Sequence, residues 1–354
     1  LVWLVVFFFL RILRPPRSTQ SRSSAASDVY KRQRLRLATL PTPIEFLPHL
    51  SAKLNGVHVW VKRDDLTGIA FGGNKIRKLE FILADALAHG AKTLITVGAA
   101  QSNHCRLTAA LAARLGLDCI LVLSGDPSAP RGGNLLLDEL LGAEIVWTTK
   151  TDRDSTLHKK FAEAWEDGRR PHLIPLGAST SVGTLGYADA FQEFLTQNVD
   201  VDWILIASSS GGTQAGLALG AYLSNWNGKI LGISIDQKEE DLKKRVADLA
   251  TEAAERLGKK ATVSPDEIHV NADYLGEGYG VLGAIEKNAI RRFAQDEGLF
   301  LDPVYTGRAG AGLIDLVNKG TIKPGERVLF WHTGGTPALF APAYQNLLLN
   351  KNQG

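Results

Sequence analysis

The chain has 354 residues, 45% hydrophobic and 22% charged, which is the composition of a globular protein long enough for two domains. Residues 1–36 hold eight Arg or Lys and one acidic residue, a net charge of +7. Because the whole chain carries +3, residues 37–354 carry −4. This mildly acidic charge argues against a nucleic-acid partner. Two cysteines exclude a disulfide framework and predict a reducing, cytoplasmic compartment, and no group of His, Cys and acidic residues shows metal-ligand spacing.

Residues 1–36 begin with LVWLVVFFFL, an apolar run that is too short to span a bilayer, so we predict no membrane partner. The run and the basic, Ser-rich sequence after it could instead belong to a signal, an anchor or an organellar targeting peptide. However, SSAASDVYKRQ (23–33) resembles a translated sequencing-adapter remnant, and the absence of Met indicates a fragment or a conceptual translation. We therefore treat residues 1–33 as foreign to the natural protein and regard 1–36 as a doubtful segment.

From residue 37 onward, strand-like and helix-like segments alternate. Short apolar runs bounded by turn residues predict strands at 57–65, 93–98, 119–125, 143–148, 203–207, 229–236 and 327–335. Amphipathic runs, several closed by Gly, predict helices at 75–90, 104–116, 135–142, 213–225 and 237–258. Buried apolar strands that alternate with helices predict an α/β fold, with parallel sheets covered by helices on both faces.

Three predicted strands run into loops rich in Gly, Ser, Thr or Asn. These loops are GAAQSNHCR (98–106), SSSGGTQAG (208–216) and HTGGT (332–336). Ligands of open α/β sheets bind at the carboxyl ends of the strands, so we expect these loops to bind a ligand.

The loop at 208–216 has the features of a phosphate-binding cradle. Its glycines let the backbone approach an anion, its hydroxyls can donate, and the following helix presents N–H groups at its positive end. No GK[ST] follows and the loop is not G-x-G-x-x-G, so a nucleoside triphosphate is not indicated. The alternative interpretation is a Gly-rich turn with a helix cap.

FGGNKIRKLE (71–80) places Lys75 directly behind Gly72 and Gly73, at the start of a predicted helix. The default interpretation of any lysine is a surface residue. A nucleophilic lysine needs a lowered pKa and room for an aldehyde, which a Gly-Gly-Asn approach would leave. Together with a phosphate cradle and no metal spacing, Lys75 indicates an aldehyde cofactor that carries a phosphate.

Five other residues stand in Gly-rich or polar motifs, and each has a structural alternative. Ser102 and Asn103 in QSNHCR could cap the helix that follows, and His104 beside them is more typical of a structural residue than of a base. Tyr279 in GEGYG and Tyr305 in DPVYTG are flanked by glycines, although isolated tyrosines are often merely packed.

The motifs GGNK-x-RKLE, QSN, SGGT, DPVY-x-G and HTGG occur here in this order. Over roughly 37–345 the sequence resembles the pyridoxal-phosphate enzymes of the tryptophan-synthase-β fold type, in the branch of D-cysteine desulfhydrase and 1-aminocyclopropane-1-carboxylate deaminase. The resemblance implies a homodimer with two three-layer αβα domains per chain, and pyridoxal 5'-phosphate in the cleft between them. The small domain would span 78–184, and the large domain would combine 37–77 with 185–354.

The resemblance also implies roles for individual residues. Lys75 would bind the cofactor aldehyde covalently and transfer the substrate α-proton. The cofactor phosphate would be bound by Lys78, Ser210, Gly211, Gly212 and Thr213.

Four further roles follow from the same resemblance. Asn103 would hydrogen-bond the hydroxyl of the cofactor ring. Ser102 would bind the substrate carboxylate and assist proton transfer. Tyr279 and Tyr305 would line the reacting face, so that Lys75, Ser102 and the two tyrosines form the catalytic set.

Two positions distinguish the branches. In the deaminase, Glu follows the DPVY tyrosine and the strand-end motif reads HLGG, whereas this chain has Thr306 and Thr333. A carboxylate would keep the pyridine nitrogen protonated and the cofactor a strong electron sink, and a Thr hydroxyl would contact a largely neutral nitrogen. Opening a cyclopropane needs more electron withdrawal than expelling thiolate, so we predict a lyase that converts D-cysteine to pyruvate, ammonia and hydrogen sulfide.

Three alternatives stay open. The same residues would serve an L-cysteate sulfo-lyase, and a 1-aminocyclopropane-1-carboxylate deaminase is disfavoured only by the two threonines. A non-catalytic ligand-binding homologue would have no need of the amine of Lys75. The sequence departs modestly from some relatives in LGAST (176–180) and at Ser209, which affects the expected shape of the pocket.

Overall fold

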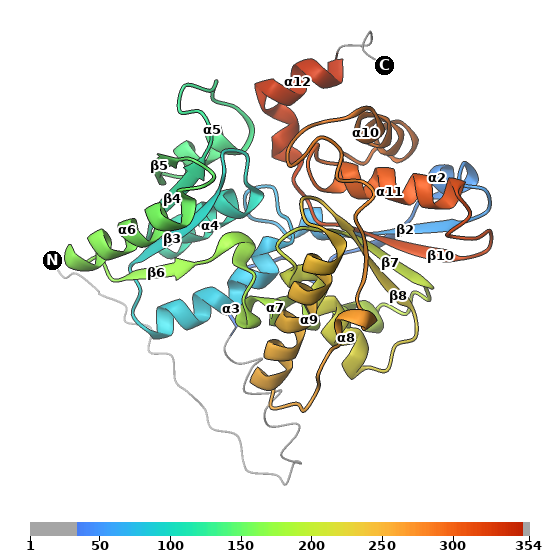
Figure 1. The fold of residues 1–354 in the computed structure, drawn as a ribbon, viewed down its shortest axis with the longest axis horizontal. Helices are drawn as coiled ribbons and strands as arrows, with labels where there is room; N and C mark the ends of the chain where they lie inside the picture. The colour runs from blue at the N-terminus through green and yellow to red at the C-terminus, as the bar shows by residue number, and fades with distance from the viewer. Residues whose placement is uncertain (1–33, 350–354) are drawn as a thin grey trace, which may run out of the picture.

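The computed structural model describes residues 34–349, and its strands form two separate sheets (Figure 1). The larger sheet has the order β1 (Ile44–Phe46), β2 (His58–Arg63), β10 (Arg327–His332), β7 (Trp203–Ser208), β8 (Lys229–Ser234) and β9 (His269–Asn271). The smaller sheet has the order β5 (Glu144–Thr148), β4 (Asp118–Ser124), β3 (Thr93–Ala99) and β6 (Pro171–Ile174). Every strand pair is parallel except β1 with β2, so the predicted α/β fold with mostly parallel sheets is confirmed.

Helices separate the strands along the chain. Those that precede or follow strands of the smaller sheet are α3 (Lys75–Ala88), α4 (Asn103–Leu115), α5 (Gly133–Leu140) and α6 (Arg153–Glu166). Those of the larger sheet are α2 (Pro48–Ala52), α7 (Ser181–Thr196), α8 (Gly212–Leu223), α9 (Glu239–Arg256), α10 (Ala284–Glu297), α11 (Thr306–Asn318) and α12 (Pro342–Leu349). Short 3-10 turns are η1 (Asp64–Leu66), η2 (Leu176–Ala178), η3 (Pro265–Glu267) and η4 (Thr336–Phe340).

The smaller sheet is buried on both faces. Successive residues of a strand point to opposite faces, so alternate side chains pack into different clusters. Leu94, Leu121 and Leu123 pack into one cluster with residues of α4. The alternate residues Val97 and Val122 pack into another cluster with α6. This alternation gives the smaller sheet its three layers.

The larger sheet has the same arrangement. Val59, Val61 and Phe330 join a core cluster with α10 and α11. The alternate residues Leu329 and Trp331 face α7 and α8. The strands of the smaller sheet all lie within 78–184 and those of the larger sheet all lie outside it, although the domain boundaries themselves stay a prediction.

The predictions for residues 1–33 lie outside the described residues. Arg34, within the doubtful segment 1–36, forms ion pairs with Glu80 of α3 and Asp189 of α7. Within residues 34–349, no helix is both long enough and apolar enough to cross a membrane.

Candidate active site

A cavity of about 440 Å³ is lined by residues from the carboxyl ends of strands in both sheets. The smaller sheet contributes residues after β3, β4 and β5, and the larger sheet contributes residues after β7, β8 and β10. Nine of the twelve predicted site residues line this cavity: Lys75, Ser102, Asn103, Ser210, Gly211, Thr213, Tyr279, Tyr305 and Thr333. The fold therefore brings together motifs that are far apart in the sequence, although their roles stay predictions.

Lys75 is the first residue of α3 and follows a tightly fixed turn. Gly72 has φ +61°, and a Cβ on it would lie 2.2 Å from the backbone oxygen of Asp65. The next glycine, Gly73, donates its N–H to the backbone oxygen of Asp64 at 3.0 Å. Asn74 donates its N–H to the backbone oxygen of Thr333 at 3.0 Å. The turn is thus anchored to the ends of both β2 and β10, and only glycine fits at position 72.

The side chain of Lys75 lines the cavity, and no carboxylate among residues 34–349 offsets the effect of burial on it. Burial lowers the pKa of Lys75 to about 8. The site of a Cβ on Gly177 would lie 3.7 Å from its Nζ, so the wall opposite the amine is glycine backbone. A neutral amine with clear space in front of it is what a nucleophile toward an aldehyde requires.

The loop after β7 has the geometry expected of an anion cradle. Gly211 has φ +81° and immediately precedes α8, so the loop leads into the positive end of a helix. The hydroxyl of Ser179 donates to the hydroxyl of Ser210 at 2.7 Å and accepts the N–H of Gly212 at 3.2 Å. A Cβ on Gly177 would lie 2.3 Å from the Ser210 Oγ, so this wall also requires glycine.

Lys78 and Gly212 do not line the cavity but lie directly behind the cradle. The Lys78 Nζ donates to the Gly177 backbone oxygen at 2.6 Å and to the Ser179 Oγ at 2.8 Å. Burial, with Lys75 and Arg245 nearby, lowers the pKa of Lys78 well below its usual range. A Cβ on Gly212 would lie 2.8 Å from this Nζ, which explains why the helix begins with glycine.

Two residues of the QSN motif stand at the start of α4: Ser102 is its N-cap, as in the capping alternative, and Asn103 is its first residue. Its Oγ accepts the N–H of Cys105 at 3.2 Å while the residue also lines the cavity. The Oδ1 of Asn103 accepts a hydrogen bond from the Nδ2 of Asn134 at 2.9 Å. This contact fixes the side-chain amide, which leaves the Asn103 Nδ2 as the group able to donate to a ligand.

Tyr279 and Tyr305 form a hydroxyl pair on the wall contributed by the larger sheet. Their oxygens lie 2.5 Å apart and their rings meet edge to face, with centroids 6.0 Å apart. Burial raises the pKa of both tyrosines, so both hydroxyls stay protonated at neutral pH. The pair can therefore donate a hydrogen bond or a proton into the cavity.

Thr306 differs from its expected placement. It is fully buried and does not line the cavity, because its hydroxyl donates to the Asp302 Oδ1 at 2.7 Å and accepts the Asp302 N–H at 2.7 Å. The expectation that this hydroxyl faces the cofactor ring therefore finds no support in the geometry. Thr333 does line the cavity, so only one of the two positions used to separate the branches stands at the site.

Several lining residues were not predicted from the sequence. Lys150 and Arg153 line the cavity from the loop after β5 and the start of α6, and Asp236 and Glu277 line it from the segments after β8 and β9. The position of Lys150 just beyond a strand end was the available signal, since the same rule selected the other loops. His104 also lines the cavity, and its Nε2 lies 2.7 Å from the Thr96 Oγ1, as expected of a structural histidine.

The residues present fit the expected cofactor. Lys75 offers an amine for an aldehyde, and the glycine-walled loop before α8 offers N–H groups and nearby positive charge for a phosphate. Pyridoxal 5'-phosphate carries both groups, and the cavity holds hydroxyl and amide groups between them.

Comparisons with known proteins agree with this geometry. The sequence model of the family "Pyridoxal-phosphate dependent enzyme" matches residues 35–334. The D-cysteine desulfhydrase of Salmonella choleraesuis is 42% identical over 317 residues, covering 87% of this chain and 95% of that protein. The crystal structure of an "ACC deaminase homologue" is 41% identical, with a TM-score of 0.84 over 94% of this chain and 99% of that one. An L-serine ammonia-lyase from Rhizomucor miehei shares the fold at 18% identity, with a TM-score of 0.65 over 90% of this chain and 99% of that one.

Proposed function

The chain belongs to the family of pyridoxal-phosphate dependent enzymes, and we propose that it is a lyase that converts D-cysteine to pyruvate, ammonia and hydrogen sulfide. The observation that carries the proposal is the convergence of Lys75, the anion cradle and the tyrosine pair on one cavity. The similarity to a relative named D-cysteine desulfhydrase over nearly its whole length supports the choice of substrate.

The cofactor, when bound, withdraws electrons from the substrate α-carbon, and the protein supplies the remaining chemistry. The Lys75 Nζ takes the α-proton, which its lowered pKa allows near neutral pH. Ser102 and Asn103 orient the substrate and the ring from the start of α4. As the bond between the β-carbon and sulfur breaks, the Tyr279–Tyr305 pair donates a proton to the leaving thiolate. The aminoacrylate that remains is released, and its hydrolysis by water gives pyruvate and ammonia.

L-cysteate is a second candidate substrate, favoured by one observation. Lys150 and Arg153 line the cavity, and neither forms an ion pair with another described residue. Two free cations at this position would bind the sulfonate of L-cysteate, whereas the neutral thiol of D-cysteine has no use for them. The choice between a neutral and an anionic β-substituent thus depends on whether that substituent lies near Lys150 and Arg153.

The test is a parallel assay of the purified protein after reconstitution with pyridoxal 5'-phosphate. D-cysteine, L-cysteate and 1-aminocyclopropane-1-carboxylate are supplied separately, and sulfide, sulfite, pyruvate and 2-oxobutanoate are measured. Sulfide and pyruvate from D-cysteine support the proposal. Sulfite from L-cysteate supports the second candidate, and 2-oxobutanoate would assign the chain to the deaminase. Absence of a visible absorbance band after reconstitution would contradict the cofactor site itself.

We also propose a cytoplasmic location and a homodimer. Cys105 and Cys119 are both buried free thiols, which fits a reducing compartment. Size-exclusion chromatography with light scattering tests the dimer, and a mass of 38.3 kDa would indicate a monomer instead.

A further inference from the structure

Two side chains outside the cavity hold the anion cradle from behind. Arg245 of α9 donates from Nε to the backbone oxygen of Ser210 at 2.9 Å. Gln237, in the loop between β8 and α9, donates from Nε2 to the backbone oxygen of Ser209. Neither Gln237 nor Arg245 lines the cavity, and no motif in the sequence marks either of them.

These two contacts determine which way the neighbouring N–H groups point. In a planar trans peptide group, the carbonyl and the N–H of the next residue point in opposite directions. When Gln237 holds the Ser209 carbonyl, the N–H of Ser210 points away from Gln237. When Arg245 holds the Ser210 carbonyl, the N–H of Gly211 likewise points away from Arg245.

The N–H groups so oriented belong to residues that line the cavity. Within residues 34–349, neither the N–H of Ser210 nor that of Gly211 donates to another backbone group. The φ of +81° at Gly211 allows successive N–H groups to converge on one point, as in anion-binding backbone nests. The cradle therefore presents free donors, and its carbonyls are turned outward.

We propose that Gln237 and Arg245 are positioning residues for the cofactor phosphate, a role that rests on the pyridoxal-phosphate site proposed above. Their surroundings limit where the two side chains can lie. The backbone of Gln237 is fixed by Ser234 at the end of β8, whose hydroxyl donates to the Gln237 carbonyl at 2.6 Å and accepts the Gln237 N–H at 3.2 Å. The Cγ and Cδ of Arg245 would lie 3.5 and 3.6 Å from a Cβ on Gly211, so the stem of Arg245 covers this glycine.

Arg245 has a second effect, because its charge remains near the cradle. It lies close enough to depress the pKa of Lys78, whose Nζ is bound to Ser179 behind the same loop. A phosphate dianion would be attracted by the charge of Arg245, while a ligand that lacks the phosphate would not. This difference separates a role in phosphate binding from a purely structural role of Arg245.

The test compares the binding of pyridoxal 5'-phosphate and of pyridoxal, which lacks the phosphate, to the apoprotein. The variants are Arg245→Met, which keeps the aliphatic stem, and Gln237→Glu, which turns the donor into an acceptor. Lys244→Met is the matched control, because Lys244 is a neighbouring exposed cation on α9 that pairs with Asp248. Dissociation constants come from absorbance titrations, and the ³¹P shift of the bound cofactor gives a second readout.

We expect Arg245→Met and Gln237→Glu to weaken pyridoxal 5'-phosphate by about tenfold, the effect of one lost hydrogen bond to a charged site. Pyridoxal binding should change by less than about twofold, and Lys244→Met should change neither. Equal weakening of both ligands, or no weakening, overturns the proposal. If the unaltered protein binds pyridoxal 5'-phosphate no better than pyridoxal, the cofactor site itself fails, and the positioning role fails with it.

Discussion

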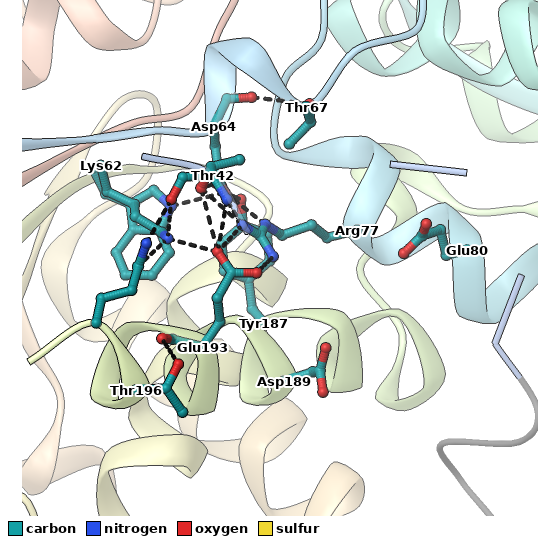
Figure 2. A network of polar contacts seen from close by, with 12 residues as sticks. Thr42, Lys62, Asp64, Thr67, Arg77, Glu80, Tyr187, Asp189, Glu193 and Thr196 are labelled. Atoms are coloured by element: carbon teal, nitrogen blue, oxygen red, sulfur yellow. Dashed lines mark hydrogen bonds and ion pairs between the residues drawn. The ribbon is translucent and has the colours of Figure 1, made fainter. Parts of the chain in front are cut away.

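The Arg77 guanidinium binds both carboxylate oxygens of Asp64, from Nε at 3.0 Å and from Nη2 at 2.8 Å (Figure 2). Both residues are fully buried. Arg77 lies two residues after Lys75 in the first turn of α3, and Asp64 directly follows β2. Asp64 also accepts hydrogen bonds from the Tyr187 hydroxyl at 2.5 Å and the Trp331 Nε1 at 2.8 Å. This network joins the helix that begins with Lys75 to the larger sheet.

Replacing Asp64 by Asn should lower the free energy of unfolding by about 3 kcal/mol, because Arg77 would lose its main buried counter-charge. The control is Asp248→Asn, which removes an exposed ion pair with Lys244 and should cost less than about 0.5 kcal/mol. Urea unfolding measures both. Equal costs for the two variants would show that the buried network contributes no more than a surface pair.

The Asp64 network should also make stability depend on pH in the acidic range. Burial by itself raises the pKa of Asp64, but Arg77 and Lys62 outweigh it and hold the pKa below its usual value. The network therefore contributes its full stability above the pKa of an unfolded Asp, about 3.9, and loses it as the pH falls further. Asp64→Asn should flatten this acid limb of the stability profile, and an unchanged limb would contradict the assignment.

Lys75 should make the apoprotein less stable than a variant without the amine. Burial lowers its pKa to about 8, whereas in the unfolded chain the pKa is near its usual value. The folded state thus binds fewer protons, so stability should rise with pH from about 8 to about 10.5. Lys75→Met should abolish this rise and raise the free energy of unfolding at pH 7 by up to about 3 kcal/mol. Lys53→Met, at an exposed lysine, is the control, and a destabilised Lys75→Met apoprotein would refute the prediction.

The same pKa should control how fast the cofactor binds. Only the neutral amine attacks an aldehyde, so below pH 8 the rate constant for pyridoxal 5'-phosphate should rise by about tenfold per pH unit and then level off. Stopped-flow absorbance measures the rate. The 4-deoxy analogue, which has no aldehyde, should bind without this slope. A slope that persists above pH 9 would mean that Lys75 titrates as an ordinary surface lysine.

The turn before Lys75 should tolerate no side chain at Gly72. Gly72→Ala forces a Cβ to within 2.2 Å of backbone at Asp65, so it should cost several kcal/mol beyond the left-handed strain of about 1–2 kcal/mol. Gly116→Ala is the matched control, because Gly116 has φ +68° but open space around it. Thermal unfolding with and without cofactor measures both. Similar losses for the two variants would show that strain alone, and not the close approach, determines the cost.

The tyrosine pair should act as one unit. Tyr279→Phe and Tyr305→Phe each remove half of the hydroxyl pair, and each should lower kcat for β-elimination by about 10²-fold. The double variant should lose little more than either single variant, because the proton donor is shared. Tyr222→Phe, at an exposed position, should leave kcat unchanged. Additive losses would mean that the two hydroxyls act separately.

The sequence by itself determined the class of the fold and much of the cavity wall. Apolar runs and Gly stops placed most strands and several helices within a few residues, although α2, α6, α7, α10, α11 and α12 were not assigned from the sequence. The loops after β7 and β10 could be grouped from the sequence, because parallel strands place their carboxyl ends at one edge of a sheet, whereas the loop after β3 belongs to the other sheet. The glycines before Lys75 indicated a special turn at this position, because few residues other than glycine adopt a backbone with positive φ.

Only the tertiary structure decided where individual side chains point. It directs the Thr306 hydroxyl to Asp302 instead of the cavity, and it brings Lys150 into the site from the other sheet. It also sets Arg245 behind the cradle, 35 positions from the carbonyl that it holds. The periodicity of apolar residues indicates which face of a helix or strand is buried. The hydrogen-bond partners of a side chain depend instead on how elements that are distant in the sequence pack together.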